Sequence, residues 1–471
     1  MKKLITYIIA LVLFFSACER PSNVRKSEEL PPIYPDYTNI TIPVNIAPLN
    51  FLLRDSIKST EVIVQGKNSS FTMYEDEKVQ FSMKVTVRIT AKVNGEWISY
   101  APFYWNIVPE KIDPYLSYRL IEPGYEVWNA IQIEERCVEN FDDRILVDNS
   151  LTDGTCMNCH IYGNQDASLS MFHLRGPNGG TVLNRNGELR KINTKAEGQL
   201  SPAIYGNFHP SGKYAVFSTN TIIPEFHSHQ NKRLEVYDTE SDLIVIDLES
   251  NKVLSSPLFS GKENLETFPV FSADGKTLYF CSAPSVSLPD SVETLKYHLC
   301  SIAFNEADGR FGTKVDTLFN ASEHDKSVCH PRTSPDGRFL LYTVADYGTF
   351  PIWHQEADLQ LIDLHTGQID SLALVNSNRS DTYHSWSSNS HWFVFASKRD
   401  DGLFGKPYFC YVDKDGTAHK PFVLPQRDPS KYDYMLKSFN IPELSKGRVP
   451  FDALDIKKLY ATQPTETVSN R

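Results

Sequence analysis

The sequence predicts a mainly β protein with an N-terminal β-sandwich-like module, a short helical segment and a β-propeller of five blades, or six if the termini complete another. Two patterns predict this fold. Residues 79–91 alternate strictly between apolar and polar side chains, as in a strand with one buried face. Four similar segments, each a polar turn before a hydrophobic strand, recur with turns at residues 212, 275, 337 and 390. Repeats of this size with several short strands each are typical of propeller blades.

The N-terminus predicts export and lipidation. Two lysines precede the apolar run 4–15, which ends in Ser16-Ala17-Cys18. This apolar core has the length of a signal-peptide core and is too short to span a bilayer. The run resembles a bacterial lipobox, which implies a signal peptide of residues 1–17, lipidation of Cys18 and a periplasm-facing place in the envelope of a Gram-negative bacterium. An ordinary cleavage site with an incidental cysteine is the alternative.

A polar, proline-containing stretch, residues 18–36, is expected to be a tether. The β-sandwich-like module follows over residues 37–109, where Asn94-Gly95 predicts a hairpin turn. Within the next segment, 110–160, apolar residues from Tyr125 to Cys137 fall at helical spacing and predict a short helix.

The strongest chemical signal is the run Cys156-Met157-Asn158-Cys159-His160. In a Cys-x-x-Cys-His motif the two thiols add to the two vinyl groups of one haem, and the histidine ligates the iron. With eight cysteines and thirteen histidines in 471 residues, about 0.004 such runs are expected by chance. The motif therefore predicts one c-type haem bound covalently by Cys156 and Cys159, with His160 as the proximal iron ligand.

Other interpretations of the motif stay open. A thioredoxin-like pair needs a βαβ setting, a zinc site needs two further ligands at suitable spacing, and a Cys156–Cys159 disulfide is possible outside the cytoplasm. The second axial ligand is also open. Met171 is the candidate that we favour from the sequence, and a vacant sixth position is equally compatible. The histidines that could line a channel or cap turns instead are His173, His209, His330 and His384.

The repeats place the propeller at residues 156–427. The segments that define them are Phe208–Phe217, Phe271–Phe280, Thr333–Tyr342 and Trp386–Phe395. The turn of the Ser-Pro-Asp-Gly type before a hydrophobic strand resembles the WD40-like repeats of TolB-type propellers. Residues 156–194 are expected to form the first blade, with the haem motif in place of its innermost strand. The insertion around residues 226–229 is expected to be a solvated loop, and residues 428–471 an extension packed outside the propeller.

Composition excludes some functions. A net charge of −11 without a basic cluster argues against nucleic-acid binding. Cys281 and Cys300 fall on consecutive expected strands and could meet in a disulfide. No hydrolase or phosphate-binding motif is present.

The expected function is electron transfer, or sensing of redox state or a small ligand, with the propeller as a docking scaffold for a protein or redox partner. The alternative is a non-enzymatic envelope interaction module, since TolB-type propellers are implied by the resemblance to act through protein contacts. A peroxidase-like haem enzyme, using His173 or Arg175, is a third possibility.

Overall fold

The computed structural model describes residues 20–54, 57–66, 69–72, 84–122, 129–229, 232–463 and 466–470. Cys18, the apolar run before it and residues 79–83 of the alternating segment lie outside the described residues. Within the described part of the chain, no helix is long and apolar enough to cross a membrane.

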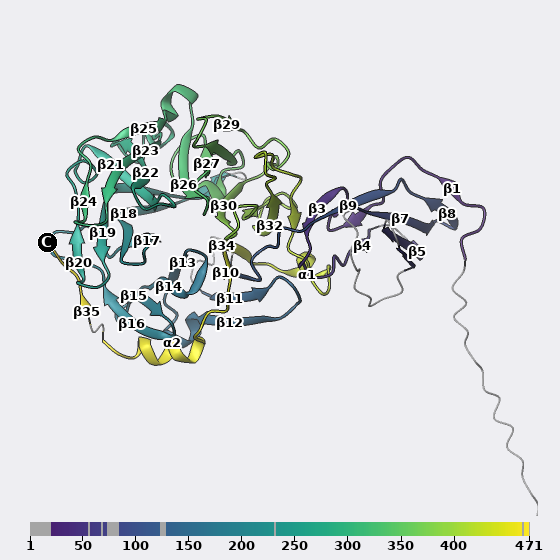
Figure 1. Cartoon of the computed structure of the whole chain (residues 1–471), viewed down its shortest axis with the longest axis horizontal. Coiled ribbons are helices and arrows are strands. Elements are labelled where there is room, and N and C mark those ends of the chain that lie inside the picture. The colour runs from purple at the N-terminus through teal and green to yellow at the C-terminus, as the bar shows by residue number, and fades with distance from the viewer. Residues whose placement is uncertain are drawn as a thin grey trace, which may run out of the picture.

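Six sheets follow one another around a central axis and form a six-bladed propeller (Figure 1). From the axis outward, blade 1 contains β34 (Ser438–Ser445), β10 (Tyr115–Ile121), β11 (Ile131–Cys137) and β12 (Asp143–Asp148). Blade 2 contains β13 (Met157–Gly163), β14 (Asp166–Leu174), β15 (Gly180–Arg185), β16 (Glu188–Asn193) and β35 (Glu466–Thr467). Blade 3 contains β17 (Ile204–Phe208), β18 (Tyr214–His229), β19 (Lys232–Asp247), β20 (Lys252–Leu254) and β36 (Ser469–Asn470).

The other three blades are continuous in sequence. Blade 4 contains β21 (Asn264–Phe271), β22 (Thr277–Pro284) and β23 (His298–Asn305), with β24 (Arg310–Phe311) and β25 (Asp316–Phe319) both paired to β23. Blade 5 contains β26 (Ser327–Thr333), β27 (Phe339–Ala345), β28 (Asp358–Asp363) and β29 (Ile369–Asp370). Blade 6 contains β30 (Asp381–Trp386), β31 (Trp392–Ser397), β32 (Lys406–Tyr411) and β33 (Phe422–Val423). Short 3-10 turns occur at Asn149–Leu151, Val292–Thr294, Ala321–His324 and Pro351–Trp353.

The innermost strands contact one another in the closed order β34, β13, β17, β21, β26, β30 and back to β34. The repeat pattern accounted for five of these blades. The sixth, blade 1, is assembled from two distant segments, because β34 near the C-terminus pairs antiparallel with β10. This pairing closes the ring.

Two expectations for these segments were wrong. The short helix expected from Tyr125 to Cys137 is not formed over its described part, because Ile131–Cys137 is β11, hydrogen-bonded on both edges to β10 and β12. The residues after 427 are also more than an outer extension, since β34 is an innermost strand. The remainder does lie outside: α1 (Lys431–Tyr434), α2 (Ala453–Tyr460), and β35 and β36, which each add a parallel edge strand to a blade.

The turns that predicted the repeats have the expected backbone. Gly212, Gly275 and Gly337 have positive φ angles of 71°, 73° and 75°, and Ser390 has a φ of 62°. At Gly275 a side chain is also excluded by packing, because an added Cβ would lie 2.2 Å from Nε2 of His209. These turns therefore fix the start of each second strand.

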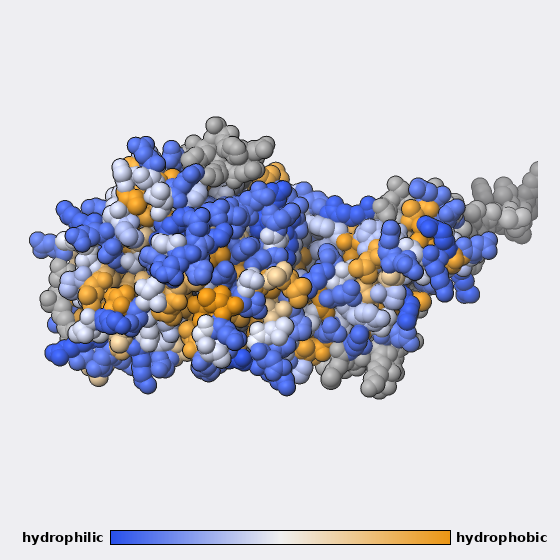
Figure 2. Space-filling view, turned by 90° about the horizontal axis from the view of Figure 1, so that it is seen from above, coloured by the Kyte–Doolittle hydropathy of each residue, from blue (hydrophilic) through white to orange (hydrophobic). Residues whose placement is uncertain are grey.

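The N-terminal module is built on one sheet of seven strands and forms a lobe beside the propeller (Figure 1 and Figure 2). Its strands are β1 (Arg25–Lys26), β3 (Ile40–Pro43), β5 (Ile57–Gly66), β6 (Ser69–Thr72), β7 (Lys84–Val93), β8 (Glu96–Ser99) and β9 (Phe103–Val108). A smaller pair consists of β2 (Ile33–Tyr34) and β4 (Leu52–Leu53). Asn94 and Gly95 make the expected turn with φ angles of 50° and 92°. The apolar core of the module continues into blade 6, where Trp392 donates a hydrogen bond to the Glu110 carbonyl at 2.8 Å.

A candidate ligand cavity on the propeller axis

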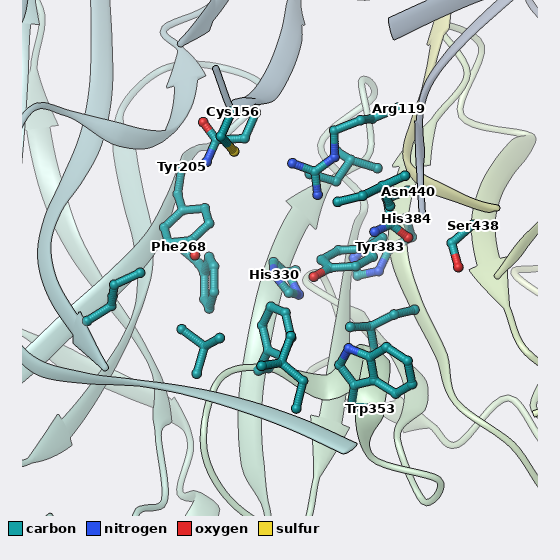
Figure 3. Close-up of a pocket in the computed structure, with 18 of the residues that line it drawn as sticks. Arg119, Cys156, Tyr205, Phe268, His330, Trp353, Tyr383, His384, Ser438 and Asn440 are labelled. Carbon is teal, nitrogen blue, oxygen red and sulfur yellow. The ribbon is translucent and has the colours of Figure 1, made fainter. Parts of the chain in front are cut away.

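A cavity of about 450 Å³ lies where the six innermost strands meet. Each of these strands contributes at least one residue to its wall. One residue per strand, in ring order, is Asn440, Asn158, Tyr205, Phe268, His330 and Tyr383. Figure 3 shows most of these side chains around the same open space. The wall of the cavity is therefore formed by all six blades together.

A β-bulge at the same level of every innermost strand builds this wall. In each pairing with its neighbour, the innermost strand has one more residue than the strand opposite it. The first bulge residue has a positive φ of 49° to 53° in five strands, namely Tyr205, Phe268, His330, Tyr383 and Ile441. All five border the cavity. Bulges redirect side chains in this way and are common next to functional sites.

Aromatic rings form a continuous arc along this wall. The ring centroids of Tyr205 and Phe268 are 4.7 Å apart, those of Phe268 and His330 4.1 Å, and those of His330 and Tyr383 4.9 Å. Such spacings are favourable for tilted aromatic pairs. The arc presents a rigid, mainly apolar surface that suits a flat apolar ligand.

Positive charge exceeds negative charge around the cavity. Arg119, Arg175, Arg332 and Lys398 border it, together with one carboxylate, Glu122. Arg119 donates to the Met157 carbonyl at 3.2 Å. This surplus favours a ligand that carries negative groups.

Arg332 has a fixed place in this wall. It forms an ion pair with Glu443 of β34 at 2.8 Å. Burial raises the pKa of Glu443 to about 6, and the nearby Arg332 opposes that rise. The ion pair joins blade 5 to the strand that closes the ring.

A long hairpin covers part of the cavity. β18 and β19 each have 16 residues and extend beyond blade 3, and the expected loop around residues 226–229 is instead the end of β18. Ile222 and Pro224 of one strand and Leu234 and Val236 of the other border the cavity. The hairpin therefore supplies apolar side chains to a wall that the blades leave incomplete.

The Cys-x-x-Cys-His motif lies at the start of the innermost strand of blade 2, with Cys156 directly before β13, as the register of the repeats predicted. Cys156 borders the cavity and is a free thiol. Cys159 and His160 occupy the bulge of β13, between the paired residues Asn158 and Ile161. Cys159 thus holds the register position that Tyr205 or His330 holds in another blade.

His160 is buried behind the cavity wall on the side of blade 1. Its ring centroid lies 6.3 Å from that of Tyr162, and the Ser117 backbone of β10 lies next to the ring. Burial lowers the pKa of His160 to about 3, against a small opposing effect of the Ser117 backbone. The side chain is therefore a neutral imidazole.

The structure does not bring Met171 to the cavity. Met171 is buried in the apolar core between blades 2 and 3, together with Ile161 and Phe217. His160 lies toward blade 1, so the two side chains are on opposite sides of blade 2. Met171 is therefore a core residue in this arrangement.

The other candidate histidines divide into two groups. His173 and His209 lie away from the axial cavity. His173 pairs with the Thr181 hydroxyl at 3.2 Å, beside a separate pocket between blades 2 and 3. His209 donates to the Gly275 carbonyl at 3.1 Å. His330 and His384 border the axial cavity. Burial lowers the pKa values of both, to about 3 for His384.

Sequence reasoning named His330 and Arg175 but missed the other members of the aromatic arc, and it missed Arg119 and Arg332. The signal that could have found them is a short pattern in the innermost strands, a bulky residue followed by proline. It is present as Phe268-Pro269, His330-Pro331 and Ile441-Pro442.

The remaining cysteines are buried thiols. Cys281 and Cys300 do not meet, because the register pairs Cys281 with Leu299 and Cys300 with Phe280, which directs the two thiols to opposite faces of blade 4. Among the described residues, no group of three or more His, Cys, Asp or Glu side chains is arranged to hold a metal ion.

No family model and no curated protein matches the chain. Solved structures with some similarity include an oligogalacturonate lyase in complex with manganese, at 12% identity and a TM-score of 0.37, covering 66% of this chain and 73% of the lyase. A prolyl endopeptidase matches at 11% identity and a TM-score of 0.37, over 67% of this chain and 42% of its own. Dipeptidyl peptidase 4 of Porphyromonas gingivalis matches at 9% identity and a TM-score of 0.27, over 74% and 58%. The strand order itself defines the class, a six-bladed β-propeller.

Proposed function

We propose that the protein is a lipid-anchored envelope protein that carries one covalent c-type haem in the axial cavity. The observation that carries this proposal is the position of Cys156, a free thiol of the Cys-x-x-Cys-His motif, on the cavity wall. The bound haem supplies one-electron exchange or binding of a small diatomic ligand. The chain's own residues hold it, orient it and limit the access of water.

The residues present fit such a group in two further respects. His160 offers a buried neutral imidazole beside the cavity wall. The wall combines an aromatic arc, suited to the face of a porphyrin, with Arg119 and Arg332, suited to its two propionates.

The position of His160 sets one requirement for iron ligation. The ring of His160 lies toward blade 1, so iron ligation requires the bulge at Cys159-His160 to present that ring to the cavity. A bulge leaves one residue outside the regular ladder, which gives this segment more freedom than a regular strand. The motif therefore lies at a point of β13 where the ladder is interrupted.

The full-length chain should be produced in a host that exports it and contains a c-type maturation system, and then solubilised in detergent. Haem staining after denaturing electrophoresis and a pyridine haemochrome spectrum report covalent haem. We expect covalent haem in the wild type and in Cys137→Ala, a matched control far from the motif, and its loss when both Cys156 and Cys159 are alanine. Cys156→Ala alone should shift the haemochrome band, since only one thioether link remains, or abolish attachment.

Absence of covalent haem in well-folded wild-type protein would contradict the proposal. The cavity would then suit a non-covalent, flat, anionic ligand, and the protein would be a binding module. With haem attached, a redox titration and exposure to carbon monoxide distinguish electron transfer from ligand sensing. The exposed outer faces of the blades are the proposed docking scaffold for a protein partner, and Cys18 is the proposed membrane attachment.

A further inference from the structure

The ring order places blade 2 and blade 5 directly opposite each other. The innermost strands follow one another as β34, β13, β17, β21, β26 and β30, so β26 is three positions from β13 in either direction. Figure 3 shows Cys156 and His330 within the same open space. His330 occupies the bulge of β26 at the register position that Cys159 occupies in β13.

A haem attached to β13 has its proximal histidine on the same strand. A haem held by Cys156, Cys159 and His160 would be attached at the blade 2 wall, and the wall opposite it belongs to blade 5. The side chain that the bulge of β26 presents from the far wall is His330, a nitrogen ligand. Imidazole is among the side chains that ligate haem iron.

The geometry points to His330 as the second axial ligand, in place of Met171, an inference that rests on the proposed haem. Nδ1 of His330 is buried without a hydrogen-bond partner among the described residues. Phe268 and Tyr383 hold the ring from its two sides, at centroid distances of 4.1 Å and 4.9 Å. Side chains fixed in this way orient an iron ligand without further conformational cost.

Three other residues have to be weighed against His330. His384 also borders the cavity, with Nε2 donating to the Leu341 carbonyl at 2.9 Å and Nδ1 without a partner among the described residues, but it is paired with Phe395 and lies outside the bulge and the aromatic arc. Met171 is in the core between blades 2 and 3. His209 holds the turns of blades 3 and 4 together through the Gly275 carbonyl.

The variant His330→Phe tests the assignment with little risk to folding. Phenylalanine already occupies the equivalent bulge position in blade 4, where Phe268 has a φ of 50° against 53° for His330. The substitution keeps the aromatic arc and removes the nitrogen. His384→Ala and Met171→Leu are the matched controls, one on the cavity wall and one in the core.

The readout is the spin state of the ferric protein, measured by electron paramagnetic resonance and the visible spectrum, with a haemochrome assay on every sample. We expect a six-coordinate low-spin signal in the wild type and in both controls. In His330→Phe and His330→Ala we expect loss of that signal with covalent haem retained, and in His330→Ala its recovery on addition of imidazole. An unchanged low-spin spectrum in His330→Phe, or a high-spin wild type, overturns the assignment of His330 and leaves the haem proposal standing. Absence of covalent haem from the wild type overturns both.

Discussion

The Glu235 carboxylate and the His354 imidazole face each other at 3.0 Å, with both side chains almost completely buried, and their chain neighbours Leu234, Val236 and Trp353 border the axial cavity. Glu235 belongs to the long hairpin of blade 3, and His354 follows the short turn Pro351–Trp353 between β27 and β28 of blade 5. Nδ1 of the same imidazole pairs with Glu356, also at 3.0 Å. This contact is a polar link between the hairpin and a blade two positions away in the ring.

Glu235→Gln should loosen the hairpin from blade 5. The substitution leaves His354 with one carboxylate, and removing one partner of a buried ion pair costs about 3–5 kcal/mol at most. We expect faster hydrogen–deuterium exchange over β18 and β19, measured by mass spectrometry, with the other blades unchanged. Glu240→Gln, on the exposed face of β19, is the control and should not alter exchange. Equal exchange in both variants would show that apolar contacts alone hold the hairpin.

The same contact predicts a dependence on pH. Burial alone would lower the pKa of His354, but the hydrogen bonds to Glu235 and Glu356 outweigh it and raise the pKa to about 9. Protonated His354 therefore stabilises the folded state. This contribution is complete below the unfolded-state pKa of about 6.5 and is lost as pH rises through about 9. The difference in free energy of unfolding between wild type and Glu235→Gln should therefore shrink between pH 6 and about 10. Denaturant titrations at several pH values check this, and a constant difference would refute it.

Glu356 determines how the stabilising effect of the same contact changes at acid pH. Burial would raise its pKa, but the hydrogen bond to His354 lowers the pKa to about 2. Its contribution is therefore present above the unfolded pKa of about 4.3 and is lost as pH falls through about 2.

Shortening a buried side chain of β34, the strand that closes the ring, should lower the free energy of unfolding markedly. Leu444 of β34 is fully buried, and a leucine-to-alanine change at such a site costs about 2–5 kcal/mol. Leu454→Ala on α2, where the side chain is 57% exposed, should change the free energy of unfolding by less than about 0.5 kcal/mol. Chemical denaturation of both variants tests whether closure by β34 determines the stability of the ring.

Lys191 should hold the C-terminal helix against blade 2. Its buried ammonium donates to the carbonyls of Asn178 at 2.9 Å, Tyr460 at 3.1 Å and Thr462. Lys191→Met leaves these carbonyls unpaired, at a cost of about 1–3 kcal/mol. We expect faster proteolytic removal of the residues after 452, whereas Lys195→Met, exposed on the surface nearby, should behave as the wild type.

Cys18→Ala should release the protein from the membrane. Acyl chains attached to Cys18 would anchor the chain through burial of their methylene groups. Fractionation of cells should find the wild type and Cys137→Ala with the membranes, and Cys18→Ala in the soluble fraction. Membrane association that is equal in all three would contradict the lipid anchor.

The repeated part of the propeller could be predicted because its signals are local. Turns such as Ser334-Pro335-Asp336-Gly337 fix the backbone within a few residues, and the structure confirms them. The strand pattern of β7 and the turn at Asn94-Gly95 were predicted for the same reason.

A sixth blade completed by the termini was left open by the sequence, but its strands were not assigned, because its defining contact joins residues about three hundred positions apart. The register pairs Tyr115 with Ser445, and a local repeat pattern contains no information about a contact between residues so far apart in the sequence. β11 was mistaken for a helix because Trp128 and Ile131 are three residues apart. The burial of Ile131 and Ile133 shows the alternation of a strand instead.

The candidate site was predicted in part. The Cys-x-x-Cys-His motif was placed correctly on the innermost strand of its blade, because its position relative to the repeats is local information. Met171 looked suitable since it is close in sequence. On a strand, however, closeness in sequence does not decide the face, and the register directs Met171 into the core between blades.

Closure by β34 has a consequence for the order in which the molecule is completed during synthesis. The strands that meet at the axis from blades 2 to 6 are made before residues 438–445, and until those residues arrive the ring of innermost strands has a gap between β30 and β13. Residues 156–160 emerge early and remain next to this opening while the rest of the chain is made. A bulky group joined to them can therefore be in place before the last strand seals the ring around it, so that no later passage through the finished wall is required.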